Sequence, residues 1–291
     1  MGCGASRGHP VWYPGEPCSC LSTLENCGTT QEVSRYRDDN GPSRGLVPMV
    51  KLTQWKFVAN GAFCSIYTAT YKGLSVVVKT VRSDLPLAQR RVALQALWQE
   101  HECLRFIDHP NIVDLYGLCR FSEEEFGVCL LVERLALGTL AHLLETNRSA
   151  KANVVTFVKA TLRKRRLSYR TRLNRVLELA LALEHVHETS MSGMTMMHRD
   201  IKSVNVGFSQ DGRLKLFDFG LAKFVCPLSS PENELYKMTG EVGSFRYMAP
   251  ELVLHKPYNA KADIYSLALL AWEILTGERP FRDLNESTFI K

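Results

Sequence analysis

The sequence predicts an α+β protein of two lobes, in which a small antiparallel sheet with one helix precedes a larger, mainly helical part. Apolar and polar residues alternate over 52–81, and the dipeptides NG at 60–61 and KG at 72–73 interrupt the alternation, as in strands joined by tight turns. Helix-forming residues with apolar side chains at helical spacing follow over 86–106. A further helical pattern, at 173–181, falls in the larger part.

Composition restricts the classes of protein that fit. The chain has 291 residues, 45% of them hydrophobic, which is enough for one large domain or two smaller ones. Nine scattered cysteines without CxxC pairs disfavour a disulfide framework and a zinc site, and indicate a reducing, cytoplasmic compartment. The net charge of +6 is concentrated in the basic run at 159–172, which fits a solvated face or a patch for a partner, lipid or nuclear import. We expect no nucleic-acid partner.

The first residues, MGCGAS, fit an acylation signal. Gly2, exposed once Met1 is removed, matches the N-myristoylation pattern together with Ser6, and Cys3 is a site for a second acyl chain. One myristoyl chain binds membranes only marginally, so a pair would give stable attachment. The alternative is a small flexible terminus that happens to begin with glycine. Residues 1–50 are predicted to be a disordered tether, because their composition cannot bury enough apolar surface to order them.

Three motifs later in the chain carry the chemistry. HRDIKSVNV at 198–206 is followed by LKLFDFG at 214–220 and SFRYMAPE at 244–251, and a lysine-bearing VVVK lies far upstream. In this order they resemble a eukaryotic protein kinase over about residues 52–284. HRDIKSVN and TGEVGSFRYMAPE resemble the tyrosine-kinase-like group, which includes Raf-type and mixed-lineage kinases. The resemblance implies the two-lobe protein kinase fold and the substrate ATP with Mg²⁺ as cofactor.

The resemblance assigns roles to four residues of the catalytic motifs. Asp200 would accept or orient the substrate hydroxyl proton, and Lys202 would offset charge on the transferred group. Asn205 and Asp218 would hold Mg²⁺ against the phosphates. Lysine at 202 favours serine and threonine hydroxyls as acceptors, although dual specificity stays open.

Two residues of the small lobe complete this set. Lys79 on the third strand would reach the α and β phosphates, and Glu100 would hold Lys79 there by an ion pair. Glu100 lies nine residues before His109 of HPNIV, which is the spacing of the family. Glu102 is the rival, but its spacing does not fit.

The nucleotide pocket departs from the family pattern. Only the middle glycine of GxGxxG is present, since Ala59 and Cys64 flank Gly61. Val77 replaces an alanine, and Gly207 stands where a leucine usually follows the asparagine; the two changes either compensate in volume or loosen the adenine site. The residues assigned to nucleotide binding are Ala59, Gly61, Cys64, Ile66, Val77, Lys79, Val132 as gatekeeper, and Glu133 and Leu135 of the hinge.

The predicted kinase domain spans 51–291, with a small lobe at 51–132, a hinge at 133–135 and a large lobe at 136–291. We expect this large lobe to lack its last helices, so that Glu251 has no arginine partner and apolar surface is left uncovered. The helix that leads to the HRDIKSVNV motif is expected to turn a core-facing stripe inward, made of Leu173, Val176, Leu177, Ala180 and Leu181.

Regulation is predicted in the activation segment, from Asp218 to Glu251. A phosphate on Thr239 would pair with Arg199 and order the segment. The hydroxyl of Ser244 would bridge Asp200 and Lys202.

The predicted function is transfer of the γ-phosphate of Mg-ATP to serine or threonine hydroxyls of protein substrates in signalling, by a cytoplasmic protein attached to a membrane through Gly2 and Cys3. The alternative is a catalytically weak or inactive pseudokinase that acts as a membrane-tethered interaction module. The sequence does not determine the oligomeric state.

Overall fold

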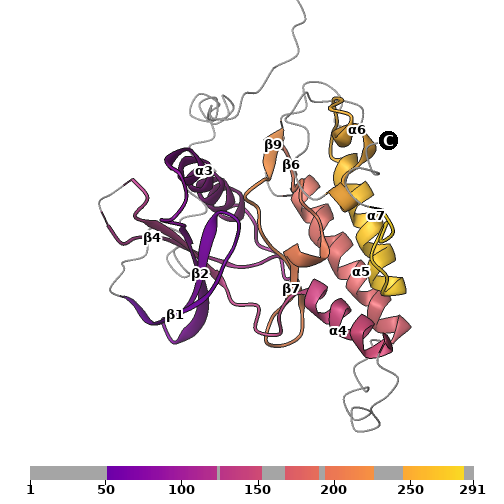
Figure 1. The fold of residues 1–291 in the computed structure, drawn as a ribbon, viewed down its shortest axis with the longest axis horizontal. Helices are drawn as coiled ribbons and strands as arrows, with labels where there is room; N and C mark the ends of the chain where they lie inside the picture. Colours follow the sequence, from indigo (N-terminus) through magenta and orange to yellow (C-terminus); the bar gives the residue numbers. More distant parts are fainter. Residues whose placement is uncertain (1–50, 123–124, 153–167, 190–193, 226–244, 285–291) are drawn as a thin grey trace, which may run out of the picture.

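The computed structural model describes residues 51–122, 125–152, 168–189, 194–225 and 245–284. A small lobe holds the main sheet and one long helix, and a larger lobe is mainly helical, as predicted (Figure 1). The small lobe comprises β1 (Leu52–Asn60), β2 (Cys64–Tyr71), β3 (Leu74–Val81), α3 (Leu87–Leu104), β4 (Leu115–Arg120) and β5 (Val128–Glu133). The larger lobe comprises α4 (Leu140–Ala152), α5 (Tyr169–Glu184), β6 (Thr195–Met197), β7 (Val206–Phe208), β8 (Leu214–Leu216), β9 (Lys223–Val225), α6 (Pro250–Val253) and α7 (Lys261–Thr276).

The small-lobe sheet places Lys79 on the face that looks toward the larger lobe. Its strands are antiparallel in the order β1-β2-β3-β5-β4, and Lys79 on β3 lies opposite Leu130 on β5. Because side chains alternate along a strand, Val76 and Val78 point to one face and are fully buried there, while Val77 and Lys79 share the other. The register of β3 therefore sets which side chains reach the cleft.

The hydrophobic core connects the two lobes. One cluster of buried residues joins Leu97 of α3 and Leu130 of β5 with Leu216 of β8 and Ile274 of α7. Cys103, Cys119 and Cys129 are fully buried free thiols. Burial raises the pKa of Cys103 to about 12, so this thiol stays protonated.

Helices α5 and α7 lie side by side in the larger lobe and support the catalytic loop, residues 198–205 (Figure 1). Ser168 caps α5, because its hydroxyl oxygen accepts the backbone N–H of Thr171. Arg172 of α5 donates to the carbonyls of Ile274 and Leu275 at 2.9 Å and so binds the C-terminal end of α7.

The predicted core-facing stripe of α5 is wrong for three of its five residues. Leu173, Leu177 and Leu181 are exposed by 43%, 57% and 43%, whereas the buried residues of the helix are Leu179, Ala182 and Leu183. From Val176 to Leu183 every residue except Glu178 is apolar, so spacing alone selects no single face. Packing against α7 and β8 decides which apolar side is buried.

Apolar surface is also exposed on α7, where Ile264 is 49% and Trp272 is 45% accessible. Within the described ranges, Glu251 makes no ion pair. No helix in those ranges has the length and hydrophobicity needed to cross a bilayer.

Candidate active site

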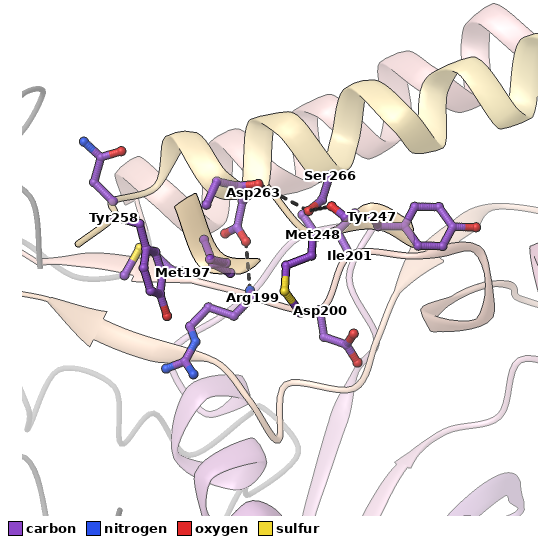
Figure 2. Close-up of a pocket in the computed structure, with 12 residues that line it drawn as sticks. Met197, Arg199, Asp200, Ile201, Tyr247, Met248, Tyr258, Asp263 and Ser266 are labelled. Carbon is purple, nitrogen blue, oxygen red and sulfur yellow. Dashed lines mark hydrogen bonds between the residues drawn. The ribbon is translucent and has the colours of Figure 1, made fainter. Parts of the chain in front are cut away.

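The catalytic loop is fixed by a buried carboxylate on α7. Asp263 is 2% exposed, and it accepts the backbone N–H groups of His198 and Arg199 at 2.8 Å and Nε2 of His187 at 2.9 Å. Burial alone would raise the pKa of Asp263, but these hydrogen bonds and the facing histidines lower it. Figure 2 shows Asp263 directed at the Arg199 backbone, while the side chains of Arg199 and Asp200 diverge. The sequence analysis gave this aspartate no role in the site.

Asp200 is held through one carboxylate oxygen and is free at the other. Its Oδ2 lies 2.7 Å from Nζ of Lys202 and accepts Nδ2 of Asn205 at 2.9 Å. Asn205 Nδ2 also donates to the backbone oxygen of Asp200 at 2.9 Å, which fixes the loop between them. Oδ1 of Asp200 is buried and has no hydrogen-bond partner among the described residues. A buried acceptor of this kind is costly unless a ligand supplies a donor.

His198 connects the HRD motif with the DFG motif. Its Nδ1 accepts the N–H of Asp200 at 3.3 Å, its Nε2 lies 3.3 Å from the backbone oxygen of Phe217, and its ring contacts Phe219 with 4.6 Å between centroids. Burial lowers the pKa of His198, because it takes the charged imidazolium out of water, and the facing carboxylates of Asp263, Asp200 and Asp218 oppose this only in part. The neutral ring therefore orients Asp200.

Lys79, Glu100 and Asp218 form a cluster across the cleft. Nζ of Lys79 lies 2.7 Å from both carboxylate oxygens of Glu100 and 3.5 Å from Oδ1 of Asp218. Burial would lower the pKa of Lys79, but the two carboxylates outweigh it and raise the pKa. The Lys79 ammonium in turn lowers the pKa of Asp218, which is a charged carboxylate at neutral pH. The predicted pairing of Lys79 with Glu100, rather than with Glu102, is what the structure shows.

Comparison with known proteins agrees with this geometry. The sequence model described as "Protein kinase domain" matches residues 52–291. The chain belongs to the protein kinase family. Its group, the tyrosine-kinase-like kinases, is confirmed by the relatives that it matches.

Three relatives illustrate the similarity. Serine/threonine-protein kinase VIK of Arabidopsis thaliana is 34% identical over 77% of this chain and 45% of its own length. Serine/threonine-protein kinase STY17 of the same plant is 26% identical over 92% of this chain and 42% of its own length. Mitogen-activated protein kinase kinase kinase 10 of Mus musculus is 27% identical over 82% of this chain and 23% of its own length. The chain thus spans less than half of each.

The magnesium residues expected of a kinase lie on adjoining segments. The backbone N–H of Phe217 donates to the carbonyl of Asn205 at 3.0 Å, which brings Asn205 beside Asp218. Asn205 uses its Nδ2 on Asp200, so its amide oxygen is the atom left for a cation. The described residues contain no group of three or more His, Cys, Asp or Glu that could hold a metal. A carboxylate and an amide oxygen fit Mg²⁺, which takes its other ligands from substrate phosphates and water.

The phosphate loop of this kinase, residues 59–64, is held by a side chain that the sequence analysis missed. Nη1 of Arg82, just after β3, donates to the carbonyl of Gly61 at 2.9 Å, and the backbone N–H of Arg82 donates to the carbonyl of Phe63 at 3.1 Å. The loop is closed on itself by Gly61 N–H to Cys64 O at 2.8 Å. A basic residue three positions after Lys79 is the only signal that the sequence offers, and it is common in surface turns.

The other residues assigned to the nucleotide pocket are positioned by the pairing of the small-lobe strands. Ala59 is opposite Ile66 across β1 and β2, and Val77 is opposite the gatekeeper Val132 across β3 and β5. Cys64 lies close to Lys79, and burial raises the pKa of its thiol to about 11.

The hinge is anchored by a buried lysine. Nζ of Lys215, on β8, lies 2.9 Å from Oε2 of Glu133 and 3.1 Å from the carbonyl of Ile112. The same Glu133 oxygen accepts the backbone N–H of Asp114 at 3.3 Å. The sequence analysis assigned Glu133 to nucleotide binding at the hinge and gave its side chain no partner; a lysine between two leucines of a buried strand was the signal for that partner.

Four of the five residues predicted for regulation and lipidation lie outside the described residues, namely Gly2, Cys3, Thr239 and Ser244. Arg199 is buried, and burial lowers its pKa against the opposing effects of Tyr258 and Asp263.

Proposed function

We propose that this kinase domain transfers the γ-phosphoryl group of Mg-ATP to serine and threonine hydroxyls of protein substrates in signalling. The observation that carries the proposal is Oδ1 of Asp200, a buried acceptor without a partner among the described residues, beside a lysine and an asparagine that hold Oδ2. A substrate hydroxyl would supply the missing donor.

The reaction step follows from this arrangement. The hydroxyl oxygen attacks the γ-phosphorus, the bond from that phosphorus to the β–γ bridging oxygen breaks, and ADP leaves with the electron pair. The hydroxyl proton passes to Oδ1 of Asp200. Lys202, 2.7 Å from Oδ2, places positive charge beside the transferred group, whose charge lies on its oxygens in a loose transition state.

Positioning of ATP is the other requirement. Glu100 holds the ammonium of Lys79 at 2.7 Å, so this group is already ordered and would lose less rotamer entropy on binding the phosphates than a free lysine would. Asn205 and Asp218 would hold Mg²⁺, which would neutralise charge at the phosphate oxygens.

The test is transfer of labelled phosphate from ATP to a generic protein substrate, followed by acid hydrolysis and separation of phosphoamino acids. Label on phosphoserine and phosphothreonine supports the proposal, whereas label on phosphotyrosine as well indicates dual specificity. Label confined to phosphotyrosine contradicts it.

The pseudokinase alternative is supported by one feature, the loop that has Ala59 and Cys64 in place of glycines. Side chains at these positions restrict the approach of backbone N–H groups to phosphates. ATP binding without any transfer to protein substrates, in a preparation with an intact fold, would establish the alternative.

Phosphorylation of Thr239 is proposed as the activating step. Arg199 lies buried at the catalytic loop, and Lys223 on β9 is close enough that the charge of Arg199 lowers its pKa further, after burial. A phosphate facing them would form charge-assisted hydrogen bonds, and Ser244 would contribute its hydroxyl near Asp200 and Lys202. Equal activity of Thr239→Ala and the natural protein, both treated with the same activating kinase, would contradict this.

Membrane attachment through acyl groups on Gly2 and Cys3 is proposed for the N-terminal tether, residues 1–50, of a cytoplasmic protein. Two chains give stable anchoring where one does not. Cell fractionation of Gly2→Ala tests it: release into the soluble fraction is expected, and retention in membranes contradicts it.

A further inference from the structure

The chain that follows the hinge is joined to β7 by backbone hydrogen bonds. The N–H of Leu137 donates to the carbonyl of Phe208 at 3.1 Å, and the N–H of Phe208 donates to the carbonyl of Gly138 at 3.0 Å. An isolated antiparallel bridge pairs Thr139 with Gly207. Gly207 is therefore the point where a second backbone comes closest to β7, a position that glycine suits.

Leu135 occupies the space that a side chain at position 207 would need. A Cβ atom added to Gly207 would lie 2.6 Å from Cδ1 and 3.3 Å from Cβ of Leu135, and 3.2 Å from the carbonyl oxygen of Gly138. The first distance is far inside van der Waals contact, so even a methyl group would displace the end of the Leu135 side chain.

The position of Leu135 in the hinge gives this contact a consequence for nucleotide binding. Leu135 comes two residues after Glu133, the last residue of β5, and its side chain packs against Gly207 in the larger lobe. On the small-lobe side, Val77 shares the cleft face of β3 with Lys79 and is half-buried. An aromatic base held at the hinge would lie between these two apolar side chains.

We propose that Leu135, seated on Gly207, forms the large-lobe wall of the adenine site and that this pair sets the affinity for the base. The wall that a side chain at 207 would otherwise provide is thus supplied from the hinge. The inference rests on the proposed function only in taking ATP as the nucleotide.

A double-mutant cycle tests the inference by binding alone. Gly207→Ala and Leu135→Ala are each expected to raise the Kd for ATP about tenfold, or about 1.4 kcal/mol. The first displaces Leu135 and the second removes it. The Kd of the double variant for ATP is expected to lie within about threefold of that of either single variant, because the methyl group added at position 207 enters the space that Leu135 has vacated. Independent effects would instead raise the Kd about a hundredfold above that of the natural protein. Independent effects that multiply would overturn the inference.

Two controls locate the effect. Leu137→Ala is the matched control: its side chain is 56% exposed, and the substitution leaves the backbone bonds to β7 intact, so the Kd should not change. Adenosine serves as a second probe, since a wall for the base must change its Kd by the same factor as that of ATP. Changed ATP affinity with unchanged adenosine affinity would refute the inference.

The outcomes also separate the inference from the proposed function. Binding of ATP by the natural protein without phosphate transfer overturns the proposed function alone, because the cycle reads affinity. Absence of any nucleotide binding overturns both. If Gly207→Ala does not fold, Leu135→Met is used in its place. The methionine side chain reaches the same space, so the Kd of this variant for ATP should lie within about threefold of that of the natural protein. A Kd equal to that of Leu135→Ala would contradict the inference.

Discussion

Replacing Glu100 with glutamine removes the carboxylate charge that faces Lys79 while keeping the size of the side chain. Glu100 is 3% exposed, and both of its oxygens lie 2.7 Å from Nζ of Lys79. Removing one partner of a buried ion pair costs about 3–5 kcal/mol when nothing else compensates. Asp218 remains 3.5 Å from the ammonium, so we expect the free energy of unfolding to fall by about 2–3 kcal/mol instead.

The same substitution should reduce catalysis, because Lys79 is then drawn toward Asp218 and away from its position for the phosphates. A displacement of about 1 Å in a positioning group costs roughly a hundredfold, and we expect kcat/KM to fall by about this factor. Urea unfolding and steady-state transfer from ATP measure the two effects.

Glu102→Gln is the matched control on the same helix. Its carboxylate is 30% exposed and lies 3.1 Å from Nη1 of Arg105 and 3.1 Å from Nδ1 of His101, and the amide oxygen of glutamine can still accept from either group. Loss of such a pair costs about 1 kcal/mol or less and should leave kcat/KM nearly unchanged. Equal losses at positions 100 and 102 would refute the reasoning.

Three further predictions concern the loop, the hinge and pH. Arg82→Ala should raise the KM for ATP about tenfold with little change in kcat, because the phosphate loop loses the donor to its carbonyl; an unchanged KM would contradict this. Lys215→Met should destabilise the fold by about 3 kcal/mol by leaving the Glu133 carboxylate without its lysine, and adding Glu133→Gln should restore part of the loss in urea unfolding; additive losses would argue against the pair. Burial holds the pKa of His198 below its ordinary value of 6.5, so the unfolded state takes up a proton that the folded state refuses. The contribution of neutral His198 to the free energy of unfolding should therefore be fully present above about pH 6.5 and should be lost as the pH falls below it. The part of the pH dependence that is due to His198 should vanish in His198→Gln.

The chemistry of the catalytic loop could be predicted from sequence because it depends on short spacings. Asp200 and Asn205 lie five residues apart within one loop, so a short stretch of backbone keeps their side chains within hydrogen-bond reach. The pairing of Lys79 with Glu100 joins a strand to a helix, and it was predicted from the resemblance, through the nine-residue spacing between Glu100 and His109.

The contacts that the sequence did not reveal join segments far apart in the chain. Lys215 meets Glu133 across the two lobes, and Asp263 reaches the catalytic loop from α7. No spacing rule encodes such distances, because they follow from how the lobes pack. The buried face of α5 was misassigned for the same reason: the sequence around Leu177 is apolar on several sides, and only the neighbours choose among them.

The most direct test of the account is the comparison of Asp200→Asn with the natural protein in phosphate transfer and in ATP binding. Asn keeps the size of the side chain but cannot take the hydroxyl proton at Oδ1, so kcat should fall by roughly 10²- to 10⁴-fold. The Kd for Mg-ATP should stay within about threefold, because Lys79, Asn205 and Asp218 are unchanged. Equal transfer by the two proteins would contradict the central claim that Asp200 is the acceptor for the substrate proton.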